Sequence, residues 1–151
     1  MTDTDHDPIE RFVRGTLGCH CPDEVFRSVA INRLPGVGDR PPVVQLLIGS
    51  RLLIHVVAAP PDAAAAGWLE QLAVHGRSAR DRHGYNRFRL VVTGPSGATT
   101  RRDLESRFAR TAVGDDRAHL HLLGADALPA GLAAAPAAAQ GSQGTIQTVA
   151  K

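Results

Sequence analysis

Residues 43–59, which read VVQLLIGSRLLIHVVAA, constrain the fold more than any other stretch of this chain. Two apolar runs flank Gly49-Ser50, and a glycine at the first central position is typical of a two-residue type II′ hairpin turn. That turn places Val44 opposite His55, and apolar side chains fill both sides of the ribbon. Because both sides must then be covered, the stretch predicts a sheet with helices above and below it, which is an α/β fold with three α/β/α layers.

Helix and strand signals on either side of the hairpin complete the predicted fold. A capping box at residues 7–10 begins a first helix that ends at Gly18. A second helix follows Asp62, weakens at His75-Gly76 and ends by Gly84, and a third begins at Thr100 and ends at Gly114. The remaining strands are predicted at 26–32, 88–93 and 118–123.

This order of elements predicts a mixed five-stranded sheet built on the central β-hairpin, with right-handed crossovers joining the last three strands. We expect residues 1–123 to form a single α/β domain. Residues 124–151 are rich in Ala, Gly and Gln and have few side chains to bury, so we expect a disordered tail there.

Composition narrows the class of protein. A chain of 151 residues can bury a core without disulfides or a structural metal. No run approaches the ~20 apolar residues of a membrane span, and the acidic start MTDTDHDPIE lacks the layout of a secretory signal. We therefore expect a cytoplasmic protein with no membrane span and with two reduced cysteines.

The first candidate site is the C-x-C pair formed by Cys19 and Cys21, with His20 between them. The predicted topology brings His83 and His119 to the same end of the sheet. Two sulfur and two nitrogen ligands suit zinc, and nearby arginines would favour a redox-active thiolate pair. Zinc sites usually space their cysteines more widely, so a purely structural role at a tight turn stays open beside the metal and redox interpretations.

The second candidate site is the loop after the strand at 88–93, which reads TGPSGATTRR. It leaves the carboxyl end of a strand and enters a helix, whose free N–H groups and dipole attract anions. The loop lacks the Gly-Lys-Ser/Thr of a Walker A motif, and ordinary turn chemistry explains the same residue types. The residues that would bind a nucleotide, a phosphate or another small anion are Gly94, Ser96, Gly97, Thr99, Thr100, Arg101 and Arg102.

The third feature is a charge asymmetry. Residues 77–110 hold nine arginines against three acids, a net charge of +6, whereas the whole chain carries +2. Arg77, Arg80 and Arg82 are the predicted partner-binding residues of this stretch. An acidic protein partner or a small anionic ligand fits it, as does a solvated helix surface. Nucleic acid is disfavoured because few aromatic residues, such as Tyr85 and Phe88, lie nearby for stacking.

The stretch FVRGTLGCHCPDEVF, followed by GSRLLIHVV and RDRHGYNRFRLVV, resembles uncharacterised small bacterial and archaeal α/β proteins with a C-x-C-P motif. The resemblance covers about residues 8–123 and implies an α/β fold. It transfers no activity, cofactor or catalytic residue to this chain.

These features favour a binding role over a recognisable reaction. No G-x-S-x-G elbow or other complete catalytic constellation occurs, although an enzyme is not excluded. We expect a small, non-catalytic accessory protein that docks to an acidic partner through an Arg-rich face. The alternatives are a thiol-redox or metal-binding protein that uses Cys19 and Cys21, with zinc as the metal, and a nucleotide- or phosphate-binding module at residues 94–102.

Overall fold

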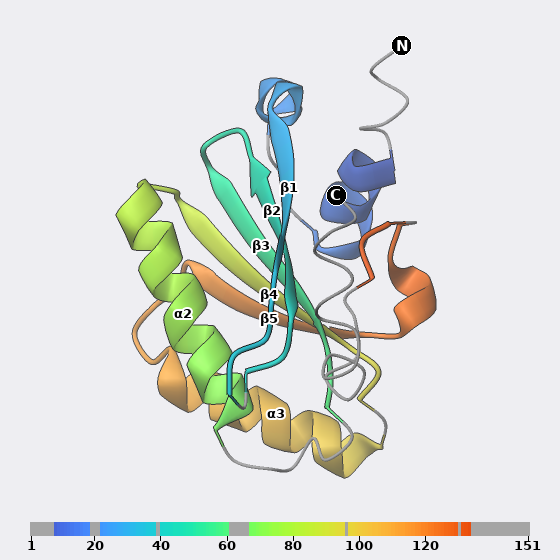
Figure 1. The fold of residues 1–151 in the computed structure, drawn as a ribbon, viewed down its shortest axis with the longest axis vertical. Helices are drawn as coiled ribbons and strands as arrows, with labels where there is room; N and C mark the ends of the chain where they lie inside the picture. The colour runs from blue at the N-terminus through green and yellow to red at the C-terminus, as the bar shows by residue number, and fades with distance from the viewer. Residues whose placement is uncertain are drawn as a thin grey trace.

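A mixed sheet forms the centre of the molecule (Figure 1). The computed structural model describes residues 8–18, 22–38, 40–60, 67–95, 97–129 and 131–133. Its five strands lie side by side in sequence order: β1 (Val29–Leu34), β2 (Val43–Ile48), β3 (Leu52–Ala58), β4 (Arg87–Thr93) and β5 (Ala118–Leu123). The β1–β2 and β2–β3 pairs are antiparallel, and the β3–β4 and β4–β5 pairs are parallel. The predicted α/β fold with a mixed five-stranded sheet is confirmed.

Two helices cover the same face of this sheet. Helix α2 (Trp68–His83) joins β3 to β4, and helix α3 (Ala98–Thr111) joins β4 to β5. Both connections step in the same direction across the sheet, and crossovers of one hand that do so lie on one face. Alternate strand residues point into this core, where they meet Trp68, Leu69, Leu72, Leu104 and Phe108.

The opposite face is covered by shorter segments (Figure 1). Residues 8–11 are helical and run into η1 (Phe12–Thr16), and η2 (Asp23–Arg27) follows after a gap in the described chain. The predicted stop at Gly18 coincides with a left-handed φ of 74°. Strand β1 begins later than predicted, because Val25 and Phe26 are buried in η2 against the sheet and do not extend the strand.

The chain after β5 also packs on this second face. The short helix η3 (Ala125–Ala127) follows β5, Leu128 is partly buried, and Leu132 is only 1% exposed. Packing therefore continues beyond residue 123, where we expected the domain to end. Residues 134–151 lie outside the described residues, so the disordered tail stays a prediction.

The hairpin turn differs from the predicted type II′ turn. Gly49 and Ser50 both have φ of 58°, which is the signature of a type I′ turn. Arg51 is a third loop residue, because Ile48 pairs with Leu52 and His55 lies opposite Gln45. The predicted pairing of Val44 with His55 was therefore wrong by one position, and a one-residue slip moves a side chain to the other face of the sheet.

Helix α2 is continuous through His75 and Gly76, where the sequence predicted a weak point. Its predicted beginning, after Asp62, falls on residues 61–66, which lie outside the described residues. Helix α3 begins at Ala98, two residues before the predicted Thr100. Among the described residues, no helix has both the length and the hydropathy to cross a membrane.

Candidate functional site

The predicted thiol or metal site lies mostly outside the described residues, since these omit Cys19, His20 and Cys21. His83 is the last residue of α2, is exposed, and meets Tyr85 edge to face at 5.9 Å. His119 lies in β5, opposite Arg89 of β4. Within the described part of the chain, no three His, Cys, Asp or Glu side chains gather as metal ligands. The zinc and redox interpretations therefore stay predictions.

The predicted anion-binding loop lies at the carboxyl end of β4, as expected for the turn into α3. Gly94 donates its N–H to the carbonyl of Leu123, and Gly97 is the N-cap residue of α3. Arg101 donates to the carbonyl of Leu122 at 3.1 Å. Thr99 and Arg102 are exposed, Thr100 is half-buried, and Ser96 lies outside the described residues. Anion binding by this loop stays a prediction.

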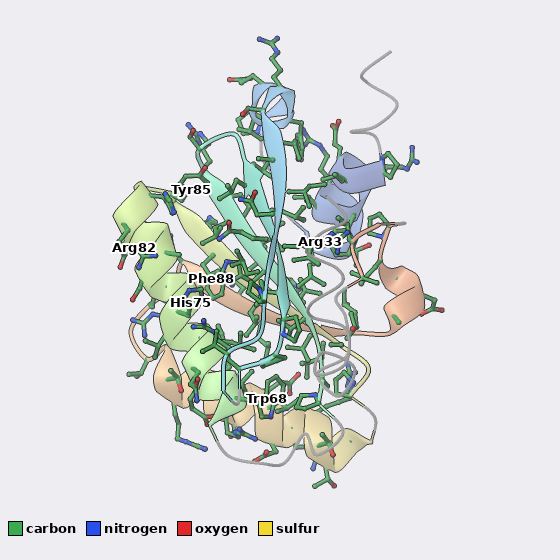
Figure 2. The ribbon with its side chains drawn as sticks, viewed as in Figure 1. Arg33, Trp68, His75, Arg82, Tyr85 and Phe88 are labelled. Carbon is green, nitrogen blue, oxygen red and sulfur yellow. The ribbon has the colours of Figure 1, made fainter. Side chains whose placement is uncertain are left out.

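The three predicted partner-binding arginines have different surroundings. Arg77 Nε lies 2.8 Å from Asp115 Oδ2. Arg80 is only 3% exposed, pairs with Asp115 at 2.9 Å, and also contacts Asp81. These two arginines therefore tie α2 to the turn before β5. Arg82 is exposed and lines a groove beside α2 (Figure 2).

A different cationic cluster lies on the sheet face opposite α2 and α3. Alternation along the parallel strands β4 and β5 places four side chains there, and we call this cluster the basic sheet face: Arg87, Arg89, His119 and His121. Nη1 of Arg87 lies 3.4 Å from Nε2 of His119, and Nη1 of Arg89 lies 2.9 Å from Nε2 of His121. Each guanidinium group therefore lies beside an imidazole of the neighbouring strand.

Arg89 is the most buried member of the basic sheet face, with 9% of its surface exposed. Its Nη1 also donates to the carbonyl of Leu17 at 3.0 Å, and its Nε has no partner among the described residues. No carboxylate within the described ranges forms an ion pair with Arg89. Burial and the nearby charge of Arg87 lower the pKa of the Arg89 guanidinium, which reflects the same unfavourable setting.

The two imidazoles of this cluster are neutral at neutral pH. Burial, followed by the charge of Arg89, lowers the pKa of His121 to about 4. Burial and the charges of Arg89 and Arg87 also lower the pKa of His119, although Asp115 and Asp116 act in the opposite direction. Since a guanidinium group only donates hydrogen bonds, Nε2 of His121 is the acceptor and its proton lies on Nδ1. The positive charge of the cluster thus comes from the arginines.

Two more arginines flank the basic sheet face where β4 begins. The carbonyl of Arg51 accepts the N–H groups of Asn86 and Arg87 at 2.8 and 3.0 Å. Arg117 Nη1 donates to the carbonyl of Asn86 at 2.8 Å. Arg51 and Arg117 are exposed, and neither forms an ion pair within the part of the chain that the structure describes. Asp115 and Asp116 act electrostatically on His119 at this end of the sheet, but among the described residues no carboxylate forms an ion pair with Arg51, Arg87, Arg89 or Arg117.

A second unusual feature is a row of polar side chains across β1, β2 and β3. Asn32, Gln45 and His55 lie opposite one another in register. Asn32 Nδ2 donates to Gln45 Oε1 at 3.1 Å, and Gln45 Nε2 lies 3.1 Å from Nε2 of His55. His55 is completely buried, and its Nδ1 has no partner among the described residues. The ring of His75, from α2, lies 5.6 Å from that of His55.

Sequence reasoning named His119 but missed Arg87, Arg89 and His121. The signal was present, because Arg-Phe-Arg in β4 and His-Leu-His in β5 both alternate with apolar residues. Parallel neighbouring strands with that alternation present their polar residues on one face of the sheet. The contact between His55 and His75 depends on the packing of α2 against the sheet, which no local sequence pattern indicates.

Comparison of the chain with protein-family models, with curated proteins and with solved structures returns no match. The resemblance to small bacterial and archaeal α/β proteins therefore stays a prediction. Any function has to be inferred from the geometry of the described residues.

Proposed function

We propose that this protein is a non-catalytic accessory protein that docks to an acidic partner through the basic sheet face. The observation that carries the proposal is the buried guanidinium group of Arg89, which has no carboxylate partner among the described residues. Arg87 and His119 lie beside it, and both are half-buried. Arg51 and Arg117 extend the positive charge onto the surface.

The energetic argument concerns unpaired buried charge. A buried cation without a counter-charge costs several kcal/mol of stability, on the order of 3–5 kcal/mol when a partner is removed. A carboxylate supplied by another protein would form charge-assisted hydrogen bonds with such a cation. Charges of opposite sign also speed the encounter of two proteins and align them. An acidic partner therefore suits this surface.

Arg77 and Arg80 have a different role in this proposal from the one that the sequence suggested. Their ion pairs with Asp115 already satisfy their charges within the chain. The partner-binding arginines are instead Arg51, Arg87 and Arg117, with Arg89 behind them. Like the sequence-based prediction, this proposal names an acidic partner and an Arg-rich face, but on the opposite side of the sheet.

The test is a binding titration with a fluorescently labelled oligo-glutamate peptide. Arg87→Glu reverses one charge at the cluster, and Arg110→Glu makes the same change at an exposed position of α3. We expect Arg87→Glu to weaken binding about tenfold, which corresponds to ~1.4 kcal/mol, whereas Arg110→Glu changes it less than about twofold. Equal losses in the two variants would mean attraction by net charge alone and would contradict the proposal.

A second candidate is a thiol-redox or metal-binding protein that uses Cys19 and Cys21. It is favoured by the hydrogen bond from Arg89 to Leu17, which is two residues before Cys19 in the sequence. Nearby cations lower the pKa of a thiol and make the thiolate more reactive. The pH dependence of alkylation tests this candidate, together with metal analysis of untagged protein. A thiol that titrates well below ~8.5, or stoichiometric zinc, would support it.

A further inference from the structure

An open groove runs along α2 on the helix-covered side of the sheet. Its volume is about 510 Å³. Arg40, from the segment before β2, lines the groove together with six residues of α2: Glu70, Gln71, Val74, His75, Ser78 and Arg82. Trp68, His75 and Arg82 mark successive positions along this helix in Figure 2. Helix α2 packs over β4 and β3. The groove lies beside the helix, toward Arg40 and the segment before β2.

The polar row leads toward this groove from inside the sheet. Gln45 Nε2 donates to Nε2 of His55, so the proton of His55 lies on Nδ1. That N–H group is completely buried and has no acceptor among the described residues. The ring of His75 lies 5.6 Å from that of His55 and lines the groove, and Nδ1 of His75 is likewise buried without a partner in the described part of the chain. Two imidazole nitrogens without a partner among the described residues therefore lie on neighbouring rings, and one of these rings lines the groove.

The charges around the groove select the type of ligand. Arg40 and Arg82 both act on His75, because their charges, after burial, lower its pKa. Glu70 also lines the groove, but Arg107 holds its carboxylate at 2.9 and 3.0 Å and lowers its pKa to about 2. The carboxylate charge is thus already neutralised. Two guanidinium groups repel a metal ion and attract an anion, so a metal held by the two histidines is disfavoured.

We propose that this groove binds a small molecule that carries a phosphate or carboxylate group. Arg40 and Arg82 bind the anionic group, and His75 and Ser78 supply hydrogen bonds. Val74, whose side chain is half exposed in the groove, contacts the apolar part of the molecule. This site is separate from the basic sheet face, because α2 and the cluster of Arg87 and Arg89 lie on opposite faces of the sheet.

The test is an NMR titration of the full chain that follows the imidazole resonances of His75. Inorganic phosphate and succinate are the two probes. We expect saturable shifts and a rise in the pKa of His75 when an anion binds. Saturation by phosphate alone assigns the site to a phosphate group, saturation by succinate alone assigns it to a carboxylate, and saturation by both shows that it recognises the shared negative charge.

Matched variants separate the groove from general charge effects. Arg40→Gln and Arg82→Gln should each weaken binding at least about fivefold. Arg102→Gln, on α3, and Arg87→Gln, on the opposite sheet face, should leave it unchanged. The proposal is overturned if neither probe gives saturable shifts, or if all four variants lose binding equally. Circular dichroism of each variant confirms that the fold is intact, since all four side chains are exposed or half-buried.

Discussion

The ring of Phe88 lies so close to the backbone of Gly76 that no side chain fits between them. A Cβ atom built on Gly76 would lie 1.9 Å from Cζ of Phe88. Phe88 is completely buried in β4, and Gly76 is in the middle of α2. Glycine therefore sets how closely α2 approaches the sheet, and this contact outweighs the low helix propensity that predicted a weak point in the helix at His75-Gly76.

We predict that Gly76→Ala lowers the free energy of unfolding by about 1–3 kcal/mol, the usual cost of forcing extra atoms into a packed core. The gain in helix propensity, about 1 kcal/mol, offsets only part of that cost. Urea denaturation measures the difference. Ser78→Ala, at an exposed position of the same helix, is the control and should be near neutral. Combining Gly76→Ala with Phe88→Leu should restore part of the stability, and additive losses would argue against the contact.

The buried ion pair between Arg80 and Asp115 gives a second prediction. The side chains of Arg80 and Asp115 are 4% and 10% exposed, and hydrogen bonds from Arg80 and Arg77 keep the pKa of Asp115 well below its usual range. Asp115→Ala leaves Arg80 buried with only the exposed Asp81 as its partner, so we expect a loss of about 3 kcal/mol. Thermal and urea denaturation provide the measurement.

The matched control for this pair is Glu10→Ala. Glu10 and Arg14 also form an ion pair at 2.9 Å, but about a third of each side chain is exposed. Exposed pairs contribute ~0–1 kcal/mol, so this variant should lose little stability. A loss for Asp115→Ala as small as that of the control would show that the buried pair does not hold α2 against the turn before β5.

A third prediction concerns pH. Burial, followed by the charges of His75 and Arg40, lowers the pKa of His55 from 6.5 to about 3. The unfolded chain takes up this proton near pH 6.5, but the folded chain does so only near pH 3. The contribution of neutral His55 to the free energy of unfolding is therefore complete above pH 6.5. As the pH falls from 6.5 toward 3, the free energy of unfolding falls by about 1.4 kcal/mol per pH unit.

Urea denaturation between pH 7 and pH 5 tests this sign and size. His121, whose pKa is lowered to about 4, should add to the loss in the same direction. Carboxyl groups contribute little in this interval, because an ordinary glutamate titrates near 4.5. The slope of the free energy of unfolding against pH is set by the number of protons taken up on unfolding, and in His55→Gln this number should fall by about one. An unchanged slope would mean that folding does not lower the pKa of His55.

The segment after β5 gives a fourth prediction. Leu132 is 1% exposed and packs among the residues that cover the second face of the sheet. Leu132→Ala should lower the free energy of unfolding by about 2–4 kcal/mol, through lost burial and a residual cavity. Val113→Ala, at a side chain 77% exposed, should change it by less than ~0.5 kcal/mol. Equal effects would mean that the chain after residue 123 adds nothing to the fold.

Local patterns predicted the sheet but not the geometry of its hairpin turn. Apolar runs, caps and glycines placed the strands and α3 within a few residues of their observed bounds. The turn at Gly49-Ser50 depends on distant residues, because the N–H of Gly49 donates to Ser28 and a Cβ at Gly49 would lie 2.5 Å from the carbonyl oxygen of Val25. The carbonyl of Arg51 accepts N–H groups at the start of β4. These long-range contacts fix the register, and they cannot be predicted from the sequence of residues 43–59 alone.

The charged residues show the same limit. The net charge of +6 over residues 77–110 suggested available arginines, but Glu70 and Asp115 lie just outside that window. Glu70 pairs with Arg107, and Asp115 pairs with Arg77 and Arg80. Charge counted along a sequence omits partners that folding supplies. Alternation along β4 and β5 is local, by contrast, so the basic sheet face could have been predicted from the sequence.

The two faces of the sheet also differ in when they can close during synthesis. Helices α2 and α3 are synthesised between the strands that they cover. The layer on the opposite face of the sheet needs both Phe12 and Leu132, which are 120 positions apart in the sequence. Contacts so distant in sequence form late. In a nascent chain, Val44, Ile54 and Val91 therefore lack the Leu132 part of their cover until the strands and the helical side have been synthesised. That interval is when a chaperone would bind and when aggregation would begin.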